Sequence, residues 1–190
     1  LLVIGFLILI QLNYEAIILG IVITPLIALY PLAKRFFILP QFILALTYNW
    51  GCFIGWAALG SNIPFSSICI LYTSLIFWTL TYDTIYATQD ENEDKDLNLY
   101  SSTLLFGSKK VIILNIMIIT KYFLIIFYGT SLDFGFIFNI LVITIFLINL
   151  IDINFIWKNK PEKASSYFSR NNYYGISLLF SIIMGSHFNV

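Results

Sequence analysis

Long apolar stretches alternate with short polar connections along the whole chain. Seven stretches are rich in Ile, Leu and Phe, and none shows the strict alternation of a half-buried strand. Most of them approach the roughly 20 residues that a helix needs to cross a bilayer. Because backbone groups in lipid must bond within their own segment, we predict transmembrane helices rather than barrel strands. The stretches span residues 1–12, 14–30, 38–59, 64–82, 111–129, 134–157 and 172–188.

The composition agrees with a membrane protein. Of 190 residues, 59% are hydrophobic and 11% are charged, with a mean hydropathy of +0.89, whereas soluble domains carry about 25% charged residues. A net charge of zero gives no reason to expect a nucleic-acid partner. Cys52 and Cys69 both lie in apolar stretches, where free thiols packed between helices are expected rather than a disulfide. We therefore expect an all-α, polytopic helix bundle that forms a single membrane domain over residues 1–190.

Basic residues occur only in alternate connections, with one exception. Nine of the ten Lys and Arg residues follow the second, fourth and sixth stretches, and the positive-inside rule places those connections on the cytoplasmic or matrix side. The exception is Lys121, within the fifth stretch, where a charge is costly and usually functional. The sequence leaves open whether Lys121 snorkels or pairs across helices. The nine residues are Lys34, Arg35, Lys95, Lys109, Lys110, Lys158, Lys160, Lys163 and Arg170.

An acidic run separates the fourth stretch from the fifth. On a continuous helix, Asp83, Asp90 and Asp94 would share one face, and the last two would lie one turn apart. Paired carboxylates suit Mg²⁺, which binds through one or two of them and through substrate phosphates. A solvated acidic loop is the alternative interpretation. Six of the ten acidic residues belong to the run: Asp83, Asp90, Glu91, Glu93, Asp94 and Asp96.

Other polar and aromatic residues also indicate ligand binding. Lys34 and Arg35 lie on the same predicted side as the acidic run and could clamp a diphosphate, although anchoring at the membrane surface is the simpler explanation. Asn49 lies within an apolar stretch, so its amide should face a cavity or a partner helix. Aromatic faces can stabilise a developing cation, although ordinary packing is the default for each ring. Three rings could line such a pocket: Tyr48, Trp50 and Trp78.

Taken together, these motifs resemble the UbiA family of membrane prenyltransferases. The motif D-x-x-x-D alone would be weak support, but five elements in the family's order make the resemblance specific. The N-W-G and D-T-x-Y-A elements favour the branch that prenylates 4-hydroxybenzoate over haem- or chlorophyll-directed relatives. The elements are Y-P-L-A-K-R (30–35), P-Q (40–41), N-W-G-x-x-x-G-W-A-A-x-G (49–60), D-T-I-Y-A-x-Q-D-x-x-x-D (83–94) and N-N-Y-x-G (171–175).

The resemblance implies a fold and a reaction. The fold would have nine transmembrane helices around a central cavity, of which this chain would supply about seven. The reaction would transfer a polyprenyl group from polyprenyl diphosphate to the ring of 4-hydroxybenzoate, in ubiquinone biosynthesis. The enzyme would lie in a bacterial or mitochondrial inner membrane, with its active-site loops on the cytoplasmic or matrix side.

The resemblance also implies roles for individual residues. Asp90 and Asp94 match the second Asp-rich motif, which holds Mg²⁺-diphosphate, and Asp83 lies two helical turns earlier. Tyr30 and Lys34 match a Y-x-x-x-K element whose lysine contacts the diphosphate. Two further residues are expected to bind substrate. Arg35 would bind the diphosphate or the benzoate carboxylate, and Asn49 is the second.

The sequence departs from the family pattern in two places. The first Asp-rich motif, N-D-x-x-D-x-x-x-D, does not occur, and its expected place is before residues 1–12, a stretch short enough to be the tail of a helix. After the second motif, the usual G-x-K-S is replaced by residues 98–101, N-L-Y-S. We therefore expect half of a metal site and predict that these 190 residues alone are inactive.

Three other interpretations remain open at this stage. One is a member of the same family that prenylates a different acceptor. The second is a transporter, which would more often show internal repeats and polar residues at the midplane. The third is a structural subunit of a membrane complex, which would not need three acidic residues on one helical face.

Overall fold

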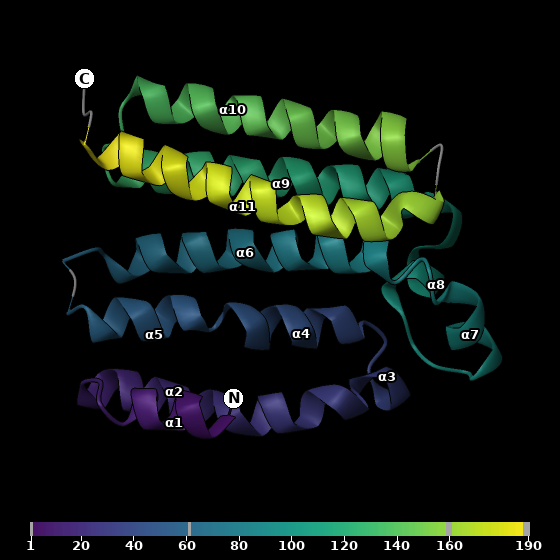
Figure 1. The fold of residues 1–190 in the computed structure, drawn as a ribbon, viewed down its shortest axis with the longest axis horizontal. Helices are drawn as coiled ribbons and strands as arrows, with labels where there is room; N and C mark the ends of the chain where they lie inside the picture. Colours follow the sequence, from purple (N-terminus) through teal and green to yellow (C-terminus); the bar gives the residue numbers. More distant parts are fainter. Residues whose placement is uncertain (1, 61, 159–160, 188–190) are drawn as a thin grey trace.

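The computed structural model describes residues 2–60, 62–158 and 161–187, and within them every regular element of secondary structure is a helix (Figure 1). This confirms the predicted all-α class. The helices are α1 (Leu2–Leu9), α2 (Tyr14–Leu29), α3 (Ala33–Phe36), α4 (Pro40–Asn49), α5 (Gly51–Ala58), α6 (Phe65–Tyr86), α7 (Glu91–Asp96), α8 (Ser102–Phe106), α9 (Lys110–Ser131), α10 (Phe136–Ile151) and α11 (Ala164–His187). A 3₁₀ turn, Tyr30–Leu32, joins α2 to α3, and a π-helical turn, Asp152–Trp157, extends α10.

Five helical stretches are long and apolar enough to cross a membrane, and they match the five inner stretches of the sequence pattern. The two terminal stretches are helical too, but they lie outside these five: α1 has only 8 residues, and α11 begins at Ala164, before its apolar part. The chain is therefore an integral membrane protein. The five are Tyr14–Phe36, Pro40–Leu59, Phe65–Tyr86, Ser102–Ser131 and Phe136–Phe155.

Helix α6 lies in the middle of the bundle, between α4–α5 on one side and α9 with α11 on the other (Figure 1). Its Trp78 and Ile85 join the largest buried cluster, to which α9, α10 and α11 also contribute. Many large apolar side chains point outward instead; Phe123, for example, is 66% exposed. Exposure of this kind is expected for a surface that faces lipid.

Helices α9 and α10 approach each other closely at Gly129. A Cβ atom at this position would overlap the Phe138 ring, so only glycine fits. Small residues at helix contacts are common in membrane bundles, because close backbones gain van der Waals contact. The contact holds α10 against the end of α9, next to the short connection that joins the two helices.

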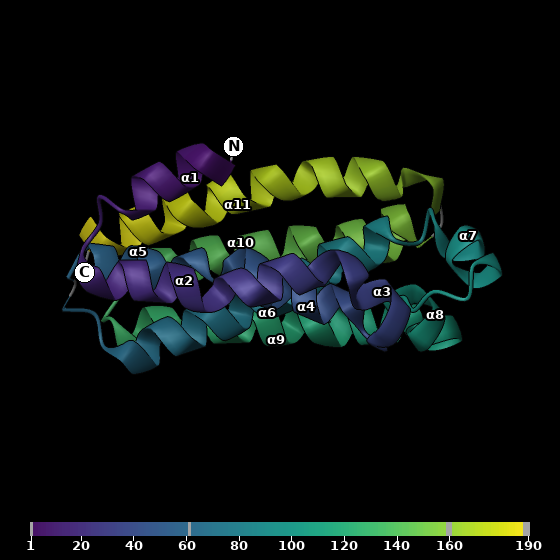
Figure 2. The same cartoon turned by 90° about the horizontal axis from the view of Figure 1, so that it is seen from below.

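The connections that carry basic residues gather at one end of the bundle. Figures 1 and 2 place α3, α7, α8 and the connection between α10 and α11 at that end, and the turns that lack basic residues at the other. The predicted alternation of the connections is therefore confirmed. Which side of the membrane this basic end faces stays a prediction.

Candidate functional site

A small cavity of about 220 Å³ opens at the basic end of the bundle. Three residues that the resemblance singled out share its wall: Tyr30, Lys34 and Asp83. They come from the turn after α2, from α3 and from the last turn of α6. Pro31, Pro40 and Gln41 complete the lining. The structure thus brings the Y-x-x-x-K, P-Q and D-T-x-Y-A elements together.

Lys34 forms an ion pair with Asp94 from α7. The ammonium Nζ lies 2.9 Å from Oδ1 and 3.2 Å from Oδ2, so it bridges both carboxylate oxygens. The Asp94 side chain is only 5% exposed, whereas the Lys34 side chain is 41% exposed. A buried carboxylate needs such a partner, because an isolated charge is costly to remove from water.

The predicted continuous helix through Asp83, Asp90 and Asp94 is wrong. Helix α6 ends at Tyr86, and α7 begins only at Glu91. After Tyr86 the α-helical ladder gives way to tighter turns, in which the N–H groups of Thr88, Gln89 and Asp90 donate to carbonyls three residues earlier at 3.1–3.2 Å. Repulsion within the acidic run also disfavours a continuous helix.

The one-turn relation between Asp90 and Asp94 survives this break. The Asp94 backbone N–H donates to the Asp90 carbonyl at 2.8 Å, across the first turn of α7. Asp83 instead lies on α6 and faces the small cavity. Within the described ranges, no three His, Cys, Asp or Glu side chains gather closely enough to hold a metal ion.

The arrangement of Asp83, Asp90 and Asp94 decides which kind of magnesium site these carboxylates could form. They do not form a three-carboxylate cage. They fit an ion that is held by one or two carboxylates, with phosphate and water completing its shell. Asp83 lines the small cavity beside Lys34, and the Lys34–Asp94 pair joins the α7 carboxylates to that wall.

The loop after α7 closes over Lys34 through its backbone. Asn98 adopts a left-handed φ of 52°, which asparagine tolerates better than most residues and which suits the family's glycine. The next two N–H groups then donate to the Asp94 and Lys34 carbonyls, both at 2.8 Å, from Leu99 and Tyr100 respectively. The replacement of glycine by Asn98 thus preserves the turn.

Gln41 connects the same loop to the membrane helices. Its side-chain Oε1 accepts a hydrogen bond from the Ser102 backbone N–H at 3.0 Å, and Thr84 donates to the Ser102 hydroxyl at 2.8 Å. Gln41 is 3% exposed. The sequence pattern included Gln41 in the P-Q element but assigned it no role, because nothing in the sequence indicated its partner.

Asp90 and Asp94 do not line the small cavity themselves, although the ion pair with Lys34 ties Asp94 to its wall. Arg35 does not line either cavity. Its side chain is exposed on α3. Its predicted contact with diphosphate or with a carboxylate stays a prediction.

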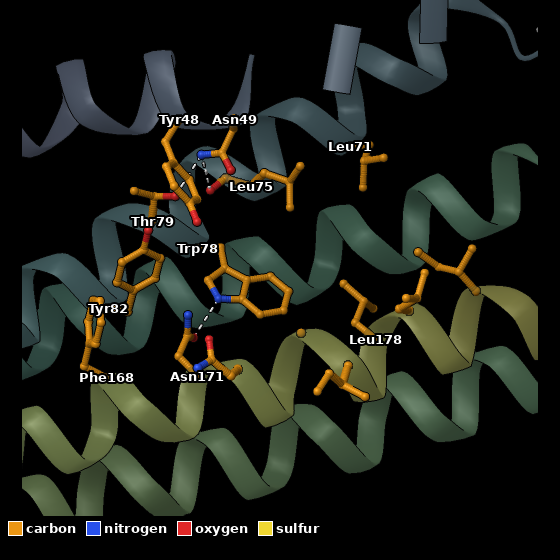
Figure 3. Close-up of a pocket in the computed structure, with 15 residues that line it drawn as sticks. Tyr48, Asn49, Leu71, Leu75, Trp78, Thr79, Tyr82, Phe168, Asn171 and Leu178 are labelled. Carbon is orange, nitrogen blue, oxygen red and sulfur yellow. Dashed lines mark hydrogen bonds between the residues drawn. The ribbon is translucent and has the colours of Figure 1, made fainter. Parts of the chain in front are cut away.

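A second, larger cavity of about 810 Å³ lies deeper in the bundle, between α4, α6 and α11 (Figure 3). Its wall is mostly apolar and aromatic, and it includes Tyr48 and Trp78, as predicted. Tyr82 and Phe168 add further rings. Tyr82 directly precedes Asp83, so α6 lines both cavities.

Trp50, the third predicted ring, does not line this cavity. Its indole N–H donates to the Leu19 carbonyl of α2 at 2.9 Å, and its ring packs edge-on against Phe53 and Tyr72. Trp50 turns away because it follows α4 at the junction with α5. The prediction that Trp50 lines the pocket is therefore wrong.

Asn49 meets both of its predicted alternatives. Its side chain lines the large cavity, and its amide nitrogen also bonds to the partner helix α6. The nitrogen donates to the Ala45 carbonyl and to Thr79 Oγ1, both at 2.8 Å, and to the Leu75 carbonyl at 3.2 Å (Figure 3).

Lys121 is fully buried and neither snorkels nor forms a salt bridge with a described residue. Its ammonium lies over two aromatic rings, 4.6 Å from the centroid of Trp78 and 4.3 Å from that of Tyr122. Such contacts offset part of the cost of burying the charge, and are worth about 2 kcal/mol or more when desolvated.

A second polar cluster lies near the basic end, outside both cavities. Asp152 binds Arg170 through two hydrogen bonds of 2.9 and 2.6 Å, and Tyr174 donates to the same carboxylate at 2.8 Å. Asp152 is 3% exposed. The cluster ties the π-helical turn after α10 to α11, so we assign it a structural role.

Comparison with known proteins decides the family. The profile of the UbiA prenyltransferase family matches residues 1–179. The chain belongs to the UbiA prenyltransferase family. The predicted resemblance is therefore confirmed.

Several curated relatives in the UbiA family carry the name 4-hydroxybenzoate polyprenyltransferase, mitochondrial. The chain is 50% identical to the Bos taurus protein over 101 residues, which cover 52% of this chain and 27% of the relative. It is 45% identical to the Arabidopsis thaliana protein over 106 residues (56% and 26%) and 41% identical to the Aedes aegypti protein over 104 residues (55% and 24%). These matches span about a quarter of each relative.

One solved structure has the same fold. It is described as digeranylgeranylglyceryl phosphate synthase in membranes, and it aligns with a TM-score of 0.71 over 97% of this chain and 66% of its own. At 18% identity, the likeness establishes the helical architecture alone.

Proposed function

We propose that this chain takes part in the transfer of a polyprenyl group from polyprenyl diphosphate to the aromatic ring of 4-hydroxybenzoate, in ubiquinone biosynthesis. One observation carries the proposal: α6 lines a small charged cavity with Asp83 and, directly beside it, a large aromatic cavity with Tyr82. A prenyl diphosphate has the same two parts, a doubly charged head and a long apolar chain. The names of the matched relatives support this choice of acceptor.

The small cavity would bind the diphosphate head. Lys34 would donate to phosphate oxygens, because its ammonium lines the cavity and its side chain is partly exposed. Asp83, Asp90 and Asp94 are the residues that would hold Mg²⁺, and the ion would stabilise the charge of the departing diphosphate. Tyr30, which lines the same cavity, would help to orient the head.

Lys34 would change partners when the substrate binds. Without substrate it pairs with Asp94, at 2.9 Å. A diphosphate in the cavity would attract the same ammonium, and the Asp94 carboxylate would then be free to act as a metal ligand. The pair keeps both groups in place without leaving a buried charge uncompensated.

The large cavity would hold the reacting ring and the prenyl chain. Breaking the allylic carbon–oxygen bond leaves a cation that aromatic faces stabilise, and Trp78 and Tyr82 supply such faces. The apolar wall keeps water away from this cation. The ring carbon beside the phenol hydroxyl then attacks the cation, and the hydrogen on that carbon leaves as a proton that the released diphosphate can accept, which restores the aromatic ring. No covalent enzyme intermediate is required.

The relatives' names also support a location in mitochondria. We infer that the basic end of the bundle faces the matrix side of the inner membrane, following the positive-inside rule. Cysteine accessibility at Ser108, in the connection between α8 and α9, would report the side directly.

A segment graft tests the function. Residues 1–179, which the family profile matches, would replace the corresponding family segment of the bovine relative. Membranes would receive labelled 4-hydroxybenzoate, a polyprenyl diphosphate and Mg²⁺. We expect prenylated product from the graft, and none from the graft with Asp94→Ala or from the 190 residues alone. A folded graft that prenylates a different acceptor, or none, would contradict the proposal.

A further inference from the structure

Asn171 projects from α11 into the large cavity, and a neighbour fixes the orientation of its amide. Its Oδ1 accepts a hydrogen bond from the Trp78 indole N–H at 2.7 Å (Figure 3). An indole nitrogen can only donate, so the amide oxygen must face Trp78 and the NH₂ group must point elsewhere. Among the described residues, no acceptor bonds to that NH₂ group. Asn171 therefore offers donors to the cavity.

Asn49 has the opposite orientation. Its amide nitrogen contacts two backbone carbonyls, of Ala45 and Leu75, and a carbonyl can only accept. The nitrogen must therefore face these groups, which leaves Oδ1 as an acceptor. In the described part of the chain, no donor bonds to that oxygen. Asn49 and Asn171 thus line one cavity with opposite hydrogen-bonding character.

We propose that the large cavity binds a hydroxylated aromatic acid between these two amides. Asn171 donates to a carboxylate oxygen, and Asn49 accepts the hydrogen of a phenolic hydroxyl. Donor and acceptor character alone assigns the two ends of the ligand, because a carboxylate cannot donate. This inference rests on the proposed function and adds the residues that select the acceptor.

The position of Asn49 agrees with the chemistry of the transfer. Its nitrogen bonds to Thr79, which precedes Asp83 by one turn on the same face of α6. The hydroxyl end of the ligand would then lie beside Thr79, one turn from the Asp83 that lines the small cavity. The ring carbon beside that hydroxyl is the carbon that attacks the prenyl group.

Lys121 does not line the large cavity, but its amine lies against the Trp78 ring that does. Its ammonium lies 4.6 Å from the centroid of the same Trp78 ring whose N–H holds Asn171. It has no carboxylate partner among the described residues. A protonated Lys121 would favour the anionic end of the ligand on the side of the Trp78 ring, where Asn171 also lies.

Two single-function ligands test the assignment on the 190-residue chain in lipid nanodiscs, without a prenyl donor. Benzoate has only the carboxylate, and p-cresol has only the hydroxyl. We expect Asn171→Leu to weaken benzoate about tenfold or more and to leave p-cresol within twofold, because a hydrogen bond to a charged group is lost. We expect Asn49→Leu to weaken p-cresol and to leave benzoate unchanged.

The crossed pattern separates the inference from simple misfolding, which would weaken both ligands together. Asn171 makes one described hydrogen bond, so its variant carries the test even where Asn49→Leu fails to fold. Ser177→Leu is the matched control, because Ser177 lies exposed on α11 outside the cavity lining. Equal weakening of benzoate and p-cresol by Asn171→Leu, or no binding of either by the wild-type chain, would overturn the inference.

The outcome is independent of the proposed function. A graft that prenylates 4-hydroxybenzoate while Asn171→Leu keeps its benzoate affinity would refute the two-amide site and leave the function standing. A graft that forms no product while the crossed pattern appears would refute the function and leave a hydroxybenzoate site.

Discussion

The Lys34 ammonium lies 2.9 Å from the carboxylate of Asp94, a residue sixty positions further along the chain. The pair joins α3 to α7 and closes the basic end over the small cavity. Because Asp94 is buried and Lys34 is partly exposed, substituting one or the other should change the free energy of unfolding by different amounts.

Lys34→Met leaves the Asp94 carboxylate buried without its partner. We expect a loss of about 1–3 kcal/mol in the free energy of unfolding, less than for a fully buried pair, because Lys34 is 41% exposed. The double variant Lys34→Met/Asp94→Asn should recover much of that loss. Thermal unfolding of the single and double variants in detergent gives the comparison. A double variant that is less stable than Lys34→Met would contradict this account.

Asn98→Ala should destabilise the loop after α7, because alanine disfavours a φ of 52° by roughly 1 kcal/mol. Asn98→Gly should be neutral or stabilising. The exposed Asn92, within α7, is the matched control: there the order should reverse, because glycine is the weaker helix former. Melting temperatures of the four variants decide the question, and the same order at both positions would refute the left-handed turn.

Gly129→Ala places a methyl group into the Phe138 ring. We expect a cost of about 1–3 kcal/mol, because the α9–α10 contact must open. Gly55→Ala is the control, because a Cβ at position 55 meets nothing within 4 Å. That variant should keep or slightly raise the unfolding temperature, since alanine is the better helix former. Equal effects at both glycines would show that α9 and α10 are not in close contact.

Lys121→Met replaces a buried ammonium, which has no hydrogen-bond partner among the described residues, with an apolar side chain of similar length. We expect the unfolding temperature to rise, because the cost of desolvating the charge exceeds the cation–π energy of about 2 kcal/mol. Trp78 fluorescence should change as the cation leaves its ring. A lower unfolding temperature would mean that the charge has a partner in the folded protein.

The sequence predicted the helices well because the membrane imposes a local rule. Each stretch in lipid must satisfy its own backbone, so a long apolar run such as 111–129 indicates a helix without knowledge of its neighbours. The alternation of basic residues then indicated which connections share an end. Both predictions depend on residues close together in the sequence.

Other features depend on distant or competing partners and could not be predicted. The break after Tyr86 depends on where the backbone changes to bonds three residues apart, which the spacing of the carboxylates does not specify. Trp50 was expected in the cavity, but it bonds to Leu19 of another helix. Asn171 belonged to a recognised motif, yet only its contact with Trp78 reveals how its amide is oriented. For Trp50 and Asn171, the spacing of residues in the sequence identified the residue but did not predict which partner its side chain contacts.

The loop over Lys34 has an evolutionary consequence. It contacts Asp94 and Lys34 through the backbone N–H groups of Leu99 and Tyr100, not through their side chains. Mutation can therefore exchange these side chains freely, as in the tyrosine that stands here for a lysine, while the closure persists. Only proline, which lacks the N–H group, would be barred from both positions. The closure of this loop therefore does not depend on the chemistry of the side chains at positions 99 and 100.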